Sequence, residues 1–339
     1  MSTHNRFWIN GIERLRFAVS TPQDAVRFAT DWGLMPVPLQ ADGSWLFKAR
    51  DGSEVEIVQA DLTYAAAAPI GGSSGLVELM FGVTDPAAFS MLADELGRDR
   101  AVAMGEDGVL HTRDDLGIGI GFRMSRRQRP PAEPTRYNAP GHADRIDRRA
   151  ARYDRAAPVE ISHVAIGVDD AGSASRFYVE RLGFFVSDRY ADRGVFLRCS
   201  PAGNHHHVFF MNGRAPGTRL NHLAFKVRDV HEVIGGGQFI DAHGWKTFAG
   251  PGRHIVSSAC FWYFHTPLGC AWEYAADEDM VTEDWETTDF AAQAHIFSEW
   301  TFGLEKSNGT LRGPISLSKA VPLDDARAEH VIVQGAGEQ

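Results

Sequence analysis

Four stretches of the chain repeat one pattern of hydrophobic and polar positions. Each opens with a short apolar run, continues with an amphipathic segment and closes with further apolar runs. Short apolar runs with alternating polarity are typical of strands, whereas apolar positions three and four residues apart indicate a helix. The pattern therefore predicts a strand, a helix and three strands in each stretch. The four stretches run near residues 8–60, 74–124, 158–212 and 219–276.

The repeat predicts how the chain is organised. Units of this kind bury their apolar faces by packing against one another, and a pair of them curls its strands into a half-open barrel around a cavity. We therefore expect an α+β fold of four βαβββ modules in two domains. The expected parts are an N-terminal domain (1–126), an arginine-rich connector (127–157), a C-terminal domain (158–290) and a C-terminal tail (291–339).

Three polar residues interrupt apolar strands of the second half. His163 lies in EISHVAIGV, His222 in RLNHLAFKV and Glu273 in GCAWEYA, and the two histidines begin equivalent strands of two modules. Two imidazoles and one carboxylate from separate strands form a facial triad, which holds divalent iron and leaves positions open for substrate and oxygen. The sequence predicts an Fe(II) site on these residues, and Mn(II) accepts the same ligands.

Aligning the sequences of the two halves of the chain with each other shows which residues of the first half occupy the ligand positions. Arg14, Glu78 and Gly121 stand where the second half has His163, His222 and Glu273. A guanidinium repels a cation and glycine has no donor side chain. We therefore expect the N-terminal domain to keep the scaffold without a metal, with Arg14 and Glu78 forming a salt bridge in the vacated place.

Composition and charge narrow the classes of protein. The chain has 339 residues, 44% of them hydrophobic and 23% charged, with no apolar run of membrane-spanning length and no signal-like start. These features predict a cytoplasmic globular protein that does not act at a membrane. The formal net charge of −10 argues against nucleic acid as a partner. The three cysteines, Cys199, Cys260 and Cys270, lack metal-binding spacing and are expected in the core.

Two further spacings connect the triad to a known family. In GRHIVSSACFWYFHTPLGCAWEY, Tyr263 follows His254 by nine residues and Glu273 follows Tyr263 by ten. In NHHHVFF, His207 precedes His222 by fifteen residues. On these motifs, residues 8–290 resemble the vicinal oxygen chelate superfamily, and within it the two-domain type I extradiol ring-cleaving dioxygenases.

The resemblance implies a function and roles for the motif residues. It implies a non-haem Fe(II) extradiol dioxygenase that uses O2 to cleave a catechol, or a more hydroxylated monocyclic arene, next to the diol. Tyr263 would donate to the deprotonated substrate oxygen, His254 would accept the hydroxyl proton, and His207 would act as acid and base on the oxygen side. His206 competes with His207 for that place. We also expect a homo-oligomer.

Some alternatives and details stay open at this point. One alternative is a glyoxalase-like isomerase or lyase with ligands from both halves, which Arg14 and Gly121 disfavour. Another is a non-catalytic protein that binds aromatic compounds. Ile255, Val256 and Ser257 follow the loop histidine where biphenyl-type members carry an Asn-Asp pair, so biphenyl-type contacts are in doubt. The ring substituents, the choice of iron or manganese and the role of His265 are not determined by the sequence.

The stretch from about Thr282 onward, which includes the C-terminal tail, carries no ligand-like cluster. Its aromatic residues are expected to pack against the barrel or a neighbouring subunit, and its last dozen residues to be poorly ordered. The aromatic residues are Trp285, Phe297, Trp300 and Phe302.

Overall fold

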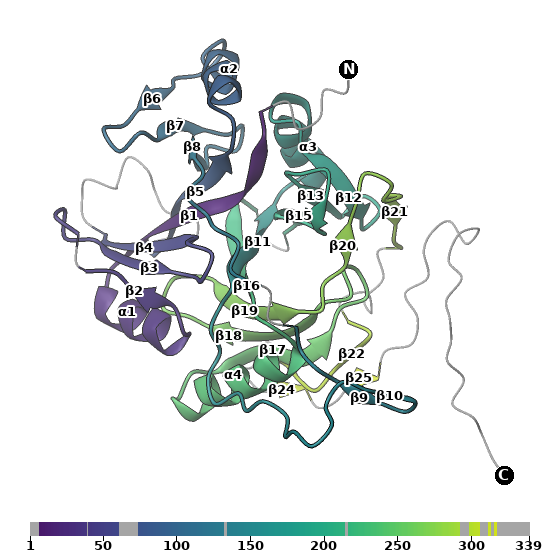
Figure 1. Cartoon of the computed structure of the whole chain (residues 1–339). Coiled ribbons are helices and arrows are strands. Elements are labelled where there is room, and N and C mark those ends of the chain that lie inside the picture. Colours follow the sequence, from purple (N-terminus) through teal and green to yellow (C-terminus); the bar gives the residue numbers. More distant parts are fainter. Residues whose placement is uncertain are drawn as a thin grey trace.

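Two large sheets organise the protein (Figure 1). The structure is a computed structural model of the whole chain. It describes residues 7–38, 40–60, 74–131, 134–213, 216–291, 298–305, 311–312 and 315–316. Phe297 and the last dozen residues, for which we made predictions, lie outside these ranges.

The first sheet, here called the N-terminal sheet, has the strand order β2-β3-β4-β1-β5-β8-β7-β6. Helices α1 (Pro22–Asp31) and α2 (Pro86–Leu96) follow its two central strands along the chain. The strands are β1 (Ile9–Val19), β2 (Met35–Pro36), β3 (Trp45–Lys48), β4 (Glu54–Gln59), β5 (Gly75–Val83), β6 (Ala103–Met104), β7 (Leu110–Arg113) and β8 (Gly119–Met124).

The second sheet, the C-terminal sheet, has the order β21-β12-β13-β15-β11-β16-β19-β18-β17-β22-β25, and β23 and β24 pair beside β17. Its helical segments are α3 (Ala171–Arg176), the π-helical turn η2 (Phe177–Arg181) and α4 (Val230–Ala242). The strands are β11 (Glu160–Val168), β12 (Phe185–Arg189), β13 (Gly194–Arg198), β15 (Val208–Asn212), β16 (Arg219–Lys226), β17 (Thr247–Arg253), β18 (Cys260–His265), β19 (Ala271–Ala276), β21 (Thr288–Asp289), β22 (Trp300–Thr301), β23 (Leu304–Glu305), β24 (Leu311–Arg312) and β25 (Ile315–Ser316).

Both sheets are built from two equivalent modules. In each, the first strands of the two modules pair antiparallel at the centre: β1 with β5, and β11 with β16. Each central strand also pairs in parallel with the last strand of its own module: β1 with β4, β5 with β8, β11 with β15 and β16 with β19. The predicted α+β fold of four repeated modules is confirmed, and its internal symmetry places equivalent residues on facing strands.

Local sequence explains where the helices begin. Asp85, Asp170 and Asp229 stand at the N-caps of α2, α3 and α4, and each carboxylate accepts a hydrogen bond from a backbone amide of the first turn. These bonds satisfy amides that have no partner within the helix. Proline starts α1 and α2, where its missing N–H costs nothing.

One hydrophobic core runs through both sheets. The ring of Trp32, which follows α1, stacks on Tyr274 of β19 with centroids 3.7 Å apart, and the Tyr274 hydroxyl donates to the Trp32 carbonyl at 2.7 Å. On the other side, the Tyr178 hydroxyl donates to Asp114 at 3.0 Å. The two halves are therefore packed together, and the predicted domain boundaries stay a prediction.

Most of the described residues of the arginine-rich connector lie on the surface, but Ala156 is buried in the hydrophobic core. Strands β9 (Asn138–Ala139) and β10 (His142–Ala143) form an exposed hairpin in the connector. Arg127 is instead largely buried, and its guanidinium bonds Asp51 at 2.6 Å and Glu160 at 3.0 Å. This residue joins the first half of the chain to the second.

The tail contacts the C-terminal sheet where it is described. The indole N–H of Trp285 donates to the Ser187 carbonyl at 3.1 Å. Trp300 lies in β22, which pairs with β17, whereas Phe302 is 64% exposed. Of the four predicted aromatic residues, Trp285 thus contacts the sheet through its side chain, whereas Trp300, which is 37% exposed, joins it through its backbone.

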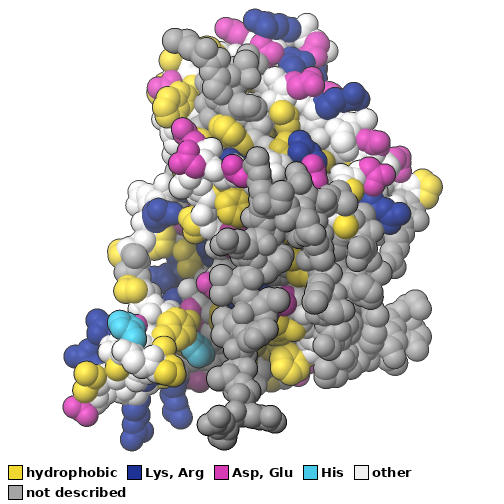
Figure 2. All heavy atoms as spheres, turned by 90° about the vertical axis from the view of Figure 1, so that its right-hand side faces the viewer, with side chains coloured by type: hydrophobic (Ala, Val, Ile, Leu, Met, Phe, Trp, Pro, Cys, Tyr) yellow, Lys and Arg dark blue, Asp and Glu magenta, His cyan; other side chains and the backbone are white. Residues whose placement is uncertain are grey.

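The molecular surface shown in Figure 2 is mixed in character. Acidic and basic side chains lie close together on this face, with apolar side chains between them. None of the described helices is long and apolar enough to cross a membrane.

Candidate metal centre

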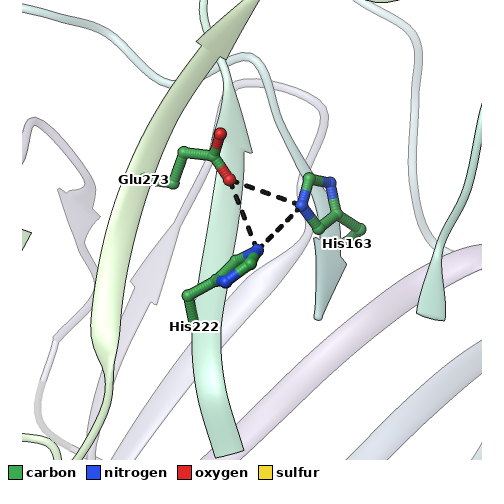
Figure 3. Close-up of side chains that lie close together, drawn as sticks. All are labelled: His163, His222 and Glu273. Carbon is green, nitrogen blue, oxygen red and sulfur yellow. Dashed lines mark hydrogen bonds and ion pairs between the residues drawn. The ribbon is translucent and has the colours of Figure 1, made fainter. Parts of the chain in front are cut away.

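Three strands of the C-terminal sheet bring the predicted ligands together. Residue 163 on β11 pairs with Ala224 on β16, and Ala224 pairs with residue 273 on β19. His163 Nε2 and His222 Nε2 lie 3.1 Å apart, and Glu273 Oε2 lies 3.4 Å from the first and 3.5 Å from the second (Figure 3). Three donor atoms therefore face one point.

The surroundings of these atoms fit a divalent metal ion. Ligands about 2.1 Å from a metal and at right angles to one another lie about 3 Å apart, close to the observed spacings. Glu273 is fully buried, and neither of its carboxylate oxygens has a hydrogen-bond partner among the described residues. A buried carboxylate without a partner is costly, and a cation would stabilise it.

The second nitrogen of each imidazole also has a suitable partner. His222 Nδ1 lies 2.9 Å from Asn221 Oδ1, and His163 Nδ1 lies 3.4 Å from Ser162 Oγ. Donation from Nδ1–H to these oxygens leaves the Nε2 lone pairs for a metal. Burial also lowers the pKa of His222 to about 3, which keeps the ring neutral.

His254 and Tyr263 lie beside Glu273, on one side of the triad. Tyr263 pairs with Glu273 across β18 and β19, and its hydroxyl is 2.9 Å from His254 Nε2. The same nitrogen is 3.5 Å from Glu273 Oε1. Burial raises the pKa of Tyr263 well above its usual value, so the hydroxyl stays protonated as a donor.

The structure places His206, and not His207, against the triad. The ring of His206 lies 4.0 Å from that of His163, centroid to centroid. His207 Nδ1 instead accepts a hydrogen bond from the Cys199 amide at 3.3 Å. Residues 205–207 precede β15 and are not in a strand, so strand alternation does not determine which of these side chains faces the triad.

A second cluster shares one histidine with the triad. Donor atoms of His163, His206 and Glu278 all lie within 4.8 Å of one another. However, Glu278 Oε2 is already 3.3 Å from the Lys226 ammonium and accepts from Ser162 at 3.3 Å. A cation next to this ammonium would be repelled. The cluster is therefore better understood as support for the triad than as a second metal site.

Sequence reasoning missed three of these supporting residues. Ser162 and Asn221 each immediately precede a ligand histidine, so a polar residue at the same place in both copies was the available signal. Glu278 lies five residues after Glu273, and the sequence repeat gave no signal that pointed to it.

The N-terminal sheet has other residues at the equivalent places. Arg14 pairs with Met80 across β1 and β5, and Met80 pairs with Gly121 on β8, which is the register of the three ligand strands. Glu78 lies two residues before Met80, as His222 lies two before Ala224. The internal alignment made from the sequence therefore agrees with the strand register.

The predicted salt bridge between Arg14 and Glu78 is wrong. Arg14 pairs with Glu54 at 2.7 Å, because Glu54 is its direct neighbour on β4. Glu78 instead lies 2.6 Å from His111 Nδ1, and this contact raises the pKa of His111. His111 is opposite Gly121, as Tyr263 is opposite Glu273.

Comparison with known proteins agrees with this architecture. Residues 160–274 match the family model described as the Glyoxalase/Bleomycin resistance protein/Dioxygenase superfamily. Metapyrocatechase 2 of Cupriavidus necator is 31% identical over 185 residues, which are 54% of this chain. The match spans 56% of that relative, so the chain covers little more than half of its length.

Solved structures share the fold over almost the whole chain. A Mn(II)-bound glyoxalase from Novosphingobium aromaticivorans superposes with a TM-score of 0.69 at 21% identity, over 92% of this chain and 97% of that one. A 2,3-dioxygenase from Pseudomonas gives 0.66 at 19% identity, over 84% and 98%. The resemblance to this superfamily inferred from the motifs is thus confirmed for residues 160–274, and the solved structures show the same fold over the rest of the chain that they cover.

Proposed function

We propose that the protein is a non-haem Fe(II)-dependent extradiol dioxygenase. Its substrate would be a catechol or a more hydroxylated monocyclic arene, cleaved by O2 next to the diol. The observation that carries the proposal is the buried group of His163, His222 and Glu273 with His254 and Tyr263 beside it. The relative named metapyrocatechase 2 and the 2,3-dioxygenase of the same fold support this class of reaction.

The triad supplies the place for the metal. Iron(II) held there would provide a Lewis acid for two adjacent substrate oxygens and a route for electrons from the ring to O2. Manganese(II) accepts the same donors, so the choice of iron over manganese is itself part of the proposal.

His254 and Tyr263 would handle the substrate hydroxyl. His254 Nε2 can take the proton of one hydroxyl, and the Tyr263 hydroxyl then donates a hydrogen bond to the resulting oxyanion. Their 2.9 Å separation lets both reach one oxygen. Because the Tyr263 hydroxyl stays protonated, it acts as a donor and not as a base.

His206 would act on the other side, where oxygen enters. It lies next to His163, whereas His254 and Tyr263 lie next to Glu273. An imidazole in this position can accept a proton at Nε2 and then donate it to the reduced oxygen. We therefore assign to His206 the role that the sequence gave to His207.

The direct test is turnover of catechol by metal-loaded protein. The protein is reconstituted anaerobically with Fe(II) or, separately, Mn(II), mixed with catechol and exposed to air. We expect oxygen uptake and a yellow ring-fission product, and neither with the His222→Ala variant. Absence of both signals in the wild type with either metal would contradict the proposal. Isomerisation of a hemithioacetal by the same preparations would instead favour the glyoxalase-like alternative.

A further inference from the structure

Glu278 lies at the junction of two groups of contacts that reach the metal centre. It follows β19 in the chain and is 8% exposed. Its Oε2 accepts from Ser162 Oγ at 3.3 Å and lies 3.3 Å from Lys226 Nζ. Its Oε1 lies 3.3 Å from His206 Nδ1 and makes no regular hydrogen bond among the described residues. One buried carboxylate thus touches both groups.

The first group fixes the orientation of a ligand. A carboxylate only accepts hydrogen bonds, so the Ser162 hydroxyl must donate to Glu278. Ser162 Oγ can then accept from His163 Nδ1, which is 3.4 Å away. With its proton on Nδ1, His163 presents the lone pair of Nε2 to the metal. Contacts of this kind orient metal-bound histidines and raise their basicity.

The second group fixes the tautomer of His206. His205 Nε2 lies 2.7 Å from Asp188 Oδ2, so it carries the proton and leaves His205 Nδ1 as an acceptor. His206 Nδ1 lies 3.1 Å from that nitrogen as well as 3.3 Å from Glu278 Oε1. Both neighbours are acceptors, which places the His206 proton on Nδ1. Its Nε2 is then the nitrogen that exchanges protons.

Lys226 keeps the carboxylate in place. Its ammonium also bonds Asn204 Oδ1 and lies 3.7 Å from Glu160, which in turn bonds Arg127. The charge of Glu278 is therefore balanced from the side away from the metal.

We propose that Glu278 is a positioning residue that holds the ring of the ligand His163, through Ser162, and the ring of His206. The His206 part rests on the proposed dioxygenase function, whereas the His163 part concerns metal binding alone.

The test compares three variants in two assays. Glu278→Gln has the same shape but lacks the charge, and Ser162→Ala removes the hydroxyl that links Glu278 to His163 while leaving the contact between Glu278 and His206. Glu54→Gln is the control, because Glu54 is a buried, ion-paired carboxylate in the N-terminal sheet. The first assay is retention of Fe(II) or Mn(II) against a graded chelator. The second is kcat and KM for catechol at saturating metal.

We expect distinct results for the three variants. Metal retention falls about 10- to 100-fold in Glu278→Gln and in Ser162→Ala, as is usual when a residue that supports a ligand is lost. At saturating metal, Glu278→Gln also loses kcat with KM nearly unchanged, and Ser162→Ala recovers most of its kcat. Glu54→Gln changes neither quantity, although its thermal stability falls.

Two outcomes would each overturn one part of the proposal. Unchanged metal retention in Glu278→Gln and Ser162→Ala would remove the His163 part. Unchanged kcat in Glu278→Gln would remove the His206 part. If Glu278→Gln does not fold, Glu278→Asp replaces it, with partial loss expected in both assays. A wild type that binds metal but does not open catechol would contradict the proposed function and leave the retention test valid.

Discussion

At the scale of single residues, the hydrogen bond made by Nδ1 of His163 and of His222 determines whether Nε2 of the same ring can bind a metal. Ser162 and Asn221 take the Nδ1 protons of the two ligand histidines, so both Nε2 atoms face Glu273. Each partner is the preceding residue in the chain, and Ser162 also donates to the distant Glu278. This arrangement explains why the polar residue before the histidine recurs in both modules.

Loss of any ligand should empty the site. We predict that His163→Ala, His222→Ala and Glu273→Ala each abolish metal retention and turnover, because two remaining donors do not define a three-ligand site. Elemental analysis after dialysis is the measurement. His243→Ala is the control, since that exposed residue bonds the Phe239 carbonyl at the end of α4. Normal metal content in a ligand variant would exclude that residue from the metal.

The two adjacent histidines offer a test of register. We predict that His206→Phe keeps its metal and binds catechol but loses turnover by roughly 100- to 10,000-fold, the usual effect of removing a positioned acid or base. His207→Phe should retain more activity, because its imidazole contacts the Cys199 amide. Single-turnover kinetics with metal-saturated protein measure the difference. The reverse ranking would restore the assignment made from the fifteen-residue spacing.

The ligands could be predicted from sequence, whereas the choice between these histidines could not. His163, His222 and Glu273 lie in regular strands, where alternation and the repeat fix which side chains face inward. His205, His206 and His207 lie before β15 in irregular backbone, and only the three-dimensional structure shows where each ring points. Spacing along the chain favoured His207, whereas the ring that lies against His163 is that of His206.

At the scale of elements, the repeat predicted the modules but not every contact between them. The four strand–helix–strand units followed from apolar periodicity. The β9–β10 hairpin and the pairing of β22 with β17 involve strands of two residues, too short to leave a periodic signal. Sequence analysis also missed ion pairs. Arg14 pairs with Glu54 because β1 and β4 are parallel neighbours, and aligning the sequences of the two halves does not reveal this register.

The packing of η2 against the loop between β7 and β8 makes a prediction about pH. Asp114 accepts from the Tyr178 hydroxyl and two backbone amides, but its burial raises its pKa to about 6. The folded protein therefore binds this proton more tightly than the unfolded chain. Unfolding free energy from this residue is highest below pH 4 and falls as the pH rises through 6, by about 3 kcal/mol in total.

The variant Asp114→Asn isolates that contribution. It cannot ionise, so the difference in unfolding free energy between it and the wild type should change across this pH window, in favour of the wild type at the acidic end. Denaturant unfolding on both sides of the window measures it. Asp115→Asn is the matched control, because the neighbouring carboxylate is exposed and pairs with Arg100. A pH-independent difference for Asp114→Asn would contradict the raised pKa.

At the scale of the whole molecule, the two sheets have the same arrangement of modules but different side chains at equivalent positions. The C-terminal sheet holds a cluster of imidazoles around one buried carboxylate, which suits a cation. The N-terminal sheet holds guanidinium groups at the same register, with Arg14 and Arg123 both bonding Glu54. Beside them, a cavity of about 590 Å³ is lined by charged residues that include Arg16, Glu78 and His111. The N-terminal sheet is thus stabilised by ion pairs formed within the protein.

This difference predicts one metal ion per chain, bound in the C-terminal sheet. Arg14 stands at the position of His163, Gly121 offers no donor atom, and Glu78 is already bonded to His111. A metal near Glu78 would have to displace the His111 contact and tolerate a guanidinium nearby, and one carboxylate cannot complete a site. Gly121 also has little room for a ligand, since a Cβ there would lie 3.2 Å from Glu78 Oε1.

Elemental analysis of three proteins checks this prediction. The wild type should contain one iron per chain after reconstitution and removal of excess metal, and Glu273→Ala should contain almost none. Arg14→Ala serves as the matched variant in the other sheet, and its iron content should equal that of the wild type because no ligand is lost. Two irons per chain in the wild type, or iron that remains in Glu273→Ala, would mean that the N-terminal sheet binds metal. In that case the equivalence of the two halves would extend to their chemistry, and a site with ligands from both would again be the better interpretation.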